Sequence, residues 1–283
     1  MGAAAVLLSL LAGACFAVSW ALQHRAACRQ ADHAVGDPRL LLRLLRRRDW
    51  LFGRLLAVAG VAAQALALRH GALSAVAPLM LTGMVFAVPV SAWLDRRATP
   101  RSQFRAVVVG LAGLAAFLGA AAPDEGTTRP GTTDWVAVFA VCGGLVLLLL
   151  AAARRQTGPV RATLLGLSTG TLFGLAAALL KADAVHLDDG LTGLLTQWTG
   201  YAWMAVCILA LVLNQNAFQG TTLAAPLTSL ALSEPLVALA IGVGAFGERV
   251  HAGGPRLLLV GGGVVAMVVG MRRLTPTVTA ART

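Results

Sequence analysis

The chain has 283 residues, of which 58% are hydrophobic and only 12% are charged. An average soluble domain has about 25% charged residues, so this composition argues against a soluble enzyme, a nucleic-acid-binding protein and a disordered protein. The formal net charge of +11 would indicate a nucleic-acid partner in a soluble protein. Here its meaning depends on where the charges lie relative to the apolar segments.

Nine segments are apolar enough to be predicted as membrane-spanning helices. Such a helix needs about 20 mostly apolar residues, because hydrocarbon offers no hydrogen-bond partner to a peptide group. In chain order the predicted spans are Ala3–Leu22, Leu51–Leu68, Ala72–Leu94, Ala106–Ala122, Trp135–Ala153, Ala162–Leu180, Trp198–Leu213, Leu223–Phe246 and Leu257–Met271. The first run lacks the basic start of a signal peptide and is long enough to span. The predicted fold class is therefore all-α and polytopic, and a tenth span would require Leu191–Gln197 to enter the bilayer.

The charges predict how the helices are oriented. Short cytoplasmic loops of membrane proteins are enriched in Lys and Arg. When the loops are assigned alternately to the two sides, most of the 23 basic residues fall on one side. The other side has most of the acidic residues and the basic residues Arg69, Arg129, Lys181, Arg249 and Arg256. This separation predicts a plasma-membrane protein with its N-terminus outside and its C-terminus in the cytoplasm. The Arg/Leu pattern of residues 39–48 is typical of a helix in the membrane interface, as an anchor or as a contact to anionic lipid.

The two halves of the chain resemble each other weakly. At a nearly constant separation, the matching segments are Gly13-Ala-Cys-Phe16 with Gly170-Thr-Leu-Phe173, Ala67-Leu68 with Ala217-Phe218, and Trp93-Leu-Asp-Arg96 with Phe246-Gly-Glu-Arg249. Spans one to four therefore map onto spans six to nine. Because the copies are an odd number of spans apart, they are expected to face opposite ways, which is typical of secondary transporters. The predicted domains are a first repeat over 1–122 with a basic amphipathic loop at 25–50, a connector with the fifth span over 123–157, a second repeat over 158–273 and a cytoplasmic tail over 274–283.

The order of these features resembles the drug/metabolite transporter superfamily of EamA-like proteins. The second half contains, in order, Ala217-Phe218, Pro226, Pro235, Glu248-Arg249 and Gly261-Gly262-Gly263. The nine-span layout, the loop Ala122-Pro-Asp-Glu125 and Gln215-Asn216-Ala217 are similar to the NIPA-like magnesium transporter branch. The resemblance implies transport of a small solute or metabolite, with transport of magnesium or another divalent cation as the alternative. The first half departs from the ten-span pattern, because the Arg/Leu segment stands where a second span is expected.

Glu234 is the residue on which transport is predicted to depend. It lies in Ser233-Glu234-Pro235 at the centre of the eighth predicted span. A carboxylate there costs at least about 2.5–3.5 kcal/mol, so it is expected to face a cavity or a partner. Desolvation favours its protonated form, which predicts a proton-coupling group or a cation ligand. The alternative is a protonated carboxyl group hydrogen-bonded to a neighbouring helix. Pro235 frees a backbone carbonyl one turn earlier, and such a broken helix can itself supply ligands.

Other polar, proline and aromatic residues within the spans complete the predicted site. Amides that could bind a solute or hold helices together are Gln64, Asn214, Gln215 and Asn216. Predicted helix-break or gating positions are Pro78, Pro89, Pro226 and Pro235. Aromatic residues that could stack on a substrate or anchor at the interface are Trp20, Trp198 and Tyr201. Ser168, Thr169 and Thr171 surround Gly170 and are expected to serve close helix packing.

The sequence therefore predicts a transporter that works by alternating access. The five histidines lack metal-ligand spacing, and there is no nucleophile or phosphate-binding motif, so neither an enzyme nor a cofactor is predicted. The expected partners are the lipid bilayer and a small-molecule solute or a cation, without nucleic acid; a homodimer is left open. A non-transporting membrane scaffold is the alternative from another class, although a scaffold would have no reason to place a carboxylate at the midplane.

Overall fold

In the computed structural model, the described part of the chain is helical. It covers residues 2–28, 47–77, 79–80, 105, 108–109, 112–113, 116–117, 120, 126–127, 130–186, 196–217, 224–249 and 254–274. The long helices are α1 (Ala3–Cys28), α3 (Arg48–Arg69), α6 (Thr132–Ala153), α7 (Gly158–Ala184), α9 (Trp198–Ala217), α10 (Ala224–Gly244) and α11 (Pro255–Leu274). A short helical segment over 73–77 follows α3. The predicted all-α class is confirmed for these residues.

Within the described residues, three helical segments are long and apolar enough to cross a membrane, namely Arg48–Arg69, Thr132–Ala153 and Val160–Ala184. Three shorter apolar segments are Ala3–Ser19, Trp198–Asn214 and Leu232–Gly244. This composition is compatible with a membrane protein. The seven long helices overlap the first, second, fifth, sixth, seventh, eighth and ninth predicted spans. Most of the third and fourth predicted spans and the basic segment 39–46 lie outside the described residues.

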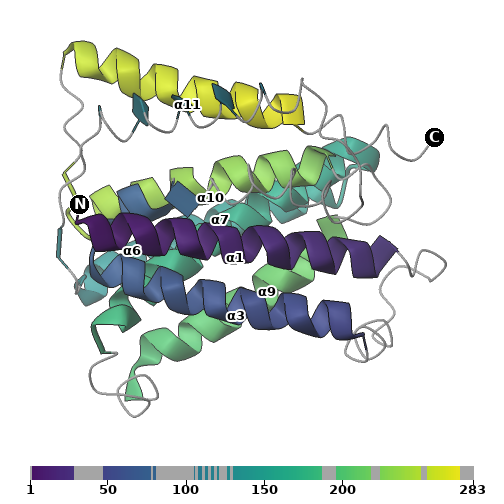
Figure 1. The fold of residues 1–283 in the computed structure, drawn as a ribbon, viewed down its shortest axis with the longest axis horizontal. Coiled ribbons are helices and arrows are strands. Elements are labelled where there is room, and N and C mark those ends of the chain that lie inside the picture. Colours follow the sequence, from purple (N-terminus) through teal and green to yellow (C-terminus); the bar gives the residue numbers. More distant parts are fainter. Residues whose placement is uncertain are drawn as a thin grey trace.

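Most of the long helices lie roughly along one common direction, and α9 runs obliquely to them (Figure 1). α7 is the central helix, because it contacts α3, α6, α9 and α10, and α1 pairs with α3. Most of α7 is buried, whereas little of α6 is buried. Large apolar side chains on α6 are exposed, among them Val136, Val141, Leu147 and Leu148. An apolar surface of this kind marks a membrane or protein contact rather than a face turned to water.

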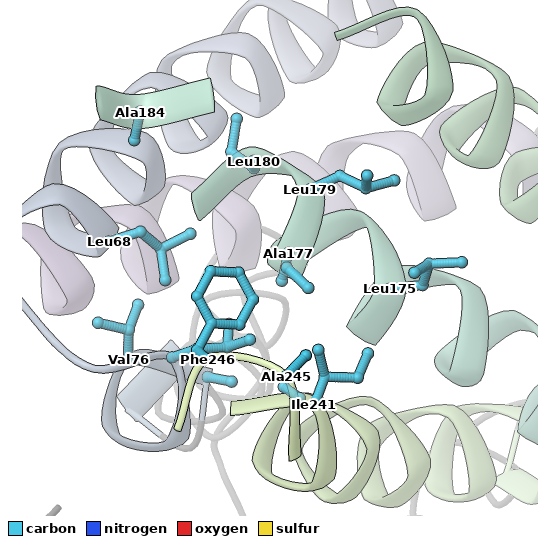
Figure 2. Close-up of a cluster of buried hydrophobic side chains, with 14 of the residues drawn as sticks. Leu68, Val76, Leu175, Ala177, Leu179, Leu180, Ala184, Ile241, Ala245 and Phe246 are labelled. Carbon is cyan, nitrogen blue, oxygen red and sulfur yellow. The ribbon is translucent and has the colours of Figure 1, made fainter. Parts of the chain in front are cut away.

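The core joins residues from distant parts of the chain. Leu68 and Val76 pack with the last turns of α7 and with the end of α10. Figure 2 shows Phe246 at the centre of these side chains, between Val76 on one side and Ala177 on the other. This core therefore binds the C-terminal end of α3 and the segment after it to the second half of the chain.

Candidate functional site

Two glycines of α7 bring this helix very close to α10. A Cβ atom at Gly170 would lie 2.5 Å from the Leu230 carbonyl oxygen and would overlap the Ser233 hydroxyl group. One turn later, a Cβ atom at Gly174 would lie 2.8 Å from the Glu234 carbonyl oxygen. Small residues spaced by four allow helix backbones in membranes to approach in this way. The contact fixes the backbone of α10 on both sides of Glu234.

The hydroxyl groups around Gly170 satisfy their hydrogen bonds within α7. Ser168, Thr169 and Thr171 each donate to the carbonyl oxygen four residues earlier, at 2.9 Å in all three cases. All three residues are buried. Because these donors are used locally, the α7 surface can pack against neighbours without leaving an unpaired hydroxyl group. This arrangement agrees with the packing role that the sequence predicts for them.

Glu234 lies in the middle of α10 and is half-buried, between the buried residues Ser233 and Pro235. The helix continues through Pro235, so the helix is not interrupted where a break was expected. Nearby, the Ser233 hydroxyl donates to the carbonyl oxygens of Ser229 at 2.9 Å and Leu230 at 3.2 Å. The structure therefore places the carboxylate on a continuous helix whose backbone is held firmly against α7.

A second group of charged residues lies at the end of the core, and sequence reasoning missed it. The Lys181 ammonium group lies 2.5 Å from Oε1 of Glu248, and both side chains are almost fully buried. Glu248 also accepts hydrogen bonds from the backbone N–H groups of Leu73 at 2.6 Å and Ser74 at 2.8 Å. These residues are up to 175 positions apart in the chain. The carboxylate thus joins α7, the turn after α10 and the segment after α3.

The Leu73 and Ser74 N–H groups need a partner for a local reason. They are the first residues of the helical segment 73–77, and N–H groups in a first helical turn have no partner within their own helix. The preceding residue is Ala72, whose side chain cannot cap the helix as Ser, Thr, Asp or Asn would. Glu248 supplies this cap from a distant part of the chain, and its negative charge also suits a helix N-terminus.

The turn after α10 is shaped to place Glu248. Gly247 has a φ of +63°, a conformation that glycine adopts without steric cost. A Cβ atom at Gly242 would lie 3.0 Å from Cδ of Glu248, so only glycine leaves full room for the carboxylate. The Glu248 N–H group donates a hydrogen bond to the Gly242 carbonyl oxygen at 2.9 Å. The Thr127 N–H group donates a hydrogen bond to the Phe246 carbonyl oxygen at 2.7 Å. The connector before α6 therefore helps to hold this turn.

A cluster of aromatic side chains lies on one side of the ion pair and contacts it through Phe246. The Lys181 ammonium group lies 4.7 Å from the centroid of the Phe246 ring, a favourable cation–π distance. Phe246 is in edge contact with Trp135, and Trp135 is in edge contact with Trp198. Trp198, predicted as a substrate or interface residue, therefore packs in this cluster, while about half of its surface is exposed.

Asp183 forms a separate buried contact two residues after Lys181. It accepts a hydrogen bond from the Thr199 hydroxyl at the start of α9. Both side chains are buried. This contact joins α7 to α9, two helices of the second half, whereas the hydrogen bonds that Glu248 accepts from Leu73 and Ser74 reach the first half.

The predicted amides do not form one cluster. Gln64 is buried on α3, next to Ala65, which packs in the core with Trp135 at the start of α6. Asn214 and Asn216 lie near the end of α9, where Ala217 packs with Ala153 at the end of α6. Gln64 and the α9 amides therefore lie towards opposite ends of the bundle.

Their hydrogen bonds also differ. The exposed Asn216 amide donates to the carbonyl oxygen of Val212 at 2.9 Å. Oδ1 of Asn214 is buried and has no hydrogen-bond partner within the described part of the chain. Asn214 therefore has an acceptor that remains available, whereas the Asn216 amide bonds within its own helix. The side chain of Gln215 lies outside the described residues.

The remaining predicted positions are only partly described. Pro78 and Pro89 lie outside the described residues, as do the side chains of Pro226 and Trp20. Tyr201 on α9 is largely exposed. Among the residues that the structure describes, no group of three or more His, Cys, Asp or Glu residues is placed to hold a metal ion.

Comparison with known proteins gives a relative without an assigned activity. No protein-family model matches the chain. The chain is 29% identical over 282 residues to an uncharacterized protein of Corynebacterium glutamicum, in an alignment that covers 97% of this chain and 96% of the relative. No solved structure matches it. The relative is thus similar over nearly its whole length.

Proposed function

We propose that this protein is a multi-pass plasma-membrane transporter of the drug/metabolite type, which moves a small solute by alternating access between two inverted halves. In this proposal the chain crosses the membrane about nine times, with its N-terminus outside and its C-terminus in the cytoplasm. The proposal depends above all on Glu234, a carboxylate in the middle of an apolar helix. Such a residue is costly in a membrane and is therefore expected to serve transport.

The helix pairing of the two halves supports the inverted repeat. In the first half, Gly60 of α3 leaves room for the ring of Phe16 on α1, because a Cβ atom at position 60 would lie 3.1 Å from its Cζ atom. In the second half, Phe173 of α7 packs against the cluster that contains the buried Ala210 of α9. Phe16 and Phe173 are matched in the weak sequence repeat, and so are α3 and α9. In each half, the phenylalanine thus packs at a place where the paired helix has a small residue nearby, Gly60 in the first half and Ala210 in the second.

Glu234 gives such a transporter a means of coupling. A carboxyl group near the midplane can take up a proton when its cavity opens to one side and release the proton when the cavity opens to the other. Solute binding would alternate with, or accompany, this protonation. The backbone around Glu234 is fixed on α7, so the carboxyl group would keep its place while the halves move around it.

The test is transport in proteoliposomes under an imposed pH gradient. The solute is first identified by a thermal-shift screen of ions and metabolites with the purified protein. Glu234→Gln is expected to abolish pH-driven transport while the protein still folds, since glutamine has a similar shape but cannot exchange a proton. Asp134→Asn is the matched control. It also removes one carboxylate. The side-chain oxygen of the asparagine can still accept the hydrogen bond that the Gly131 N–H group donates to Asp134 at 2.9 Å.

Two results would contradict the proposal. Unchanged pH-driven transport in Glu234→Gln would remove Glu234 from the mechanism. Thermal stabilisation by Mg²⁺ alone, with no organic solute stabilising the protein, would favour the divalent-cation alternative. In that case retained water and backbone carbonyls would have to complete the oxygen shell that Mg²⁺ requires.

A further inference from the structure

We propose that Lys181, Glu248 and the N–H groups of Leu73 and Ser74 form a latch that holds one end of the transporter closed. The inference rests on the proposed function, because a latch is needed only if the two halves move. These four groups are the latch. They lie at the end of the core at which α3, α7 and α10 finish.

The latch connects the predicted halves of the chain. Leu73 and Ser74 belong to the first repeat, whereas Lys181 and Glu248 belong to the second. Both backbone hydrogen bonds to Glu248 cross between the halves. When the halves rock, contacts within one half persist and contacts between the halves have to separate at the side that opens. These two hydrogen bonds therefore have to break whenever this end opens.

The chemistry of the latch suits a contact that is made and broken. A buried ion pair gains Coulombic energy but loses the hydration of both charges, so these two contributions nearly cancel. When this end opens, water can solvate the ammonium group, the carboxylate and the freed N–H groups. The latch therefore fixes the register of the closed end through directed hydrogen bonds. A purely apolar contact of the same area would give no such direction.

The surrounding residues hold the carboxylate ready for this contact. Gly242 leaves space for it, and the Thr127 N–H group anchors the turn at the Phe246 carbonyl oxygen. The Phe246 ring lies against the Lys181 ammonium group. Figure 2 shows the same ring among apolar side chains of both halves, including Leu68 and Val76 of the first. Lys181 and Glu248 therefore stay together in the second half, and the N–H groups of the first half dock onto them.

Ser74 offers a direct probe of the latch. Its side chain is fully buried, and its hydroxyl group has no hydrogen-bond partner among the described residues. Ser74→Cys therefore removes no described side-chain hydrogen bond and leaves the backbone N–H group in place. The four native cysteines, Cys15, Cys28, Cys142 and Cys207, are replaced by alanine in the same chain. The readout is the initial rate at which a membrane-impermeant maleimide, added outside intact cells, modifies the new thiol.

With the latch intact, we expect Ser74→Cys to react slowly. Glu248→Gln removes the charge and one acceptor oxygen, so it should increase the labelling rate at least tenfold. Lys181→Gln, which leaves the carboxylate without its cation, is the second variant and should act in the same direction. It keeps the test decisive if Glu248→Gln does not accumulate in the membrane.

Two controls separate an open latch from general loosening. Thr199→Val breaks the buried hydrogen bond to Asp183 near the latch, but only within the second half. It should lower stability and leave the labelling of Ser74→Cys slow. Ser168→Cys places the thiol at a buried position on α7. It should stay unreactive when Glu248→Gln is added.

The latch is overturned if neither Glu248→Gln nor Lys181→Gln accelerates the labelling of Ser74→Cys. It is also overturned if Glu248→Gln accelerates the labelling of Ser168→Cys equally. The proposed function fails separately. If the latch variants accelerate labelling but no ion or metabolite is transported in proteoliposomes, the halves move and the transporter proposal is wrong. If Glu234→Gln abolishes pH-driven transport but Ser74→Cys is still labelled slowly in both latch variants, the transporter proposal stands and the latch does not.

Discussion

Gly170 of α7 and Ser233 of α10 are in such close contact that no Cβ atom fits at position 170 without overlapping the serine hydroxyl group. The Leu230 carbonyl oxygen lies beside the same point, and backbone atoms cannot turn away as a side chain can. The backbone that carries Glu234 is therefore positioned by a glycine on another helix. A loss of this contact should affect stability and transport together.

Gly170→Ala tests this contact. We expect the added methyl group to separate α7 from α10 and to lower the free energy of unfolding by about 1–3 kcal/mol, the usual cost of overpacking. Thermal unfolding in detergent measures the change. Gly143→Ala is the matched control, because a Cβ atom on Gly143 of α6 meets no heavy atom within 4 Å. Equal stability of the two variants would show that α7 and α10 do not depend on the glycine.

The buried ion pair predicts how the free energy of unfolding changes when one or both charges are removed. Lys181→Met alone should lower the free energy of unfolding by about 3–5 kcal/mol, because the Glu248 carboxylate stays buried without its cation. The double variant Lys181→Met with Glu248→Gln should lose less than the sum of the two single variants, since no unpaired charge remains. Thermal unfolding of the four proteins gives the coupling between the two residues. Additive losses would mean that the two side chains do not interact in the folded protein.

Much of the helical layout follows from local patterns in the sequence. Apolar runs of sufficient length predicted the seven long helices, and small residues around Gly170 predicted close packing. Backbone groups in hydrocarbon have to be hydrogen-bonded within the protein, so an apolar run that spans a membrane forms a helix. Composition alone therefore predicts the secondary structure of such runs. Boundaries were less accurate: α1 continues six residues past the predicted Leu22, to Cys28.

The latch could not be predicted in this way, because it depends on residues far apart in the chain. The charge pattern places Lys181 in a loop on the non-cytoplasmic side, whereas the structure buries it together with Glu248. One signal is present: Ala72, which precedes the helical segment 73–77, has no side chain that can cap it, so the first N–H groups of this segment need another partner. Sequence spacing does not show which distant acid supplies it.

Gly242→Ala should weaken the latch without changing any charge. A methyl group at position 242 meets the Glu248 carboxylate and also approaches the Ser74 nitrogen atom to 3.4 Å. The carboxylate then has to move away from the two N–H donors. We expect a severalfold increase in the labelling rate of Ser74→Cys. Gly244→Ala is the control two residues further along, where no heavy atom lies within 4 Å, and it should leave labelling slow. Equal labelling in both variants would show that the space at Gly242 does not position the carboxylate.

Asn214 distinguishes a solute-binding amide from one that holds helices together. Its buried Oδ1 atom accepts no hydrogen bond from any described residue, so it contributes little to helix contacts through that atom. Asn214→Leu removes an unsatisfied polar group and should keep or raise the melting temperature in detergent. If the amide binds solute, the same variant should raise the KM of transport in proteoliposomes several-fold. Asn216→Leu is the control, because the Asn216 amide bonds to its own helix at Val212 and should not affect KM. A lower melting temperature with unchanged KM in Asn214→Leu would instead assign Asn214 a structural role.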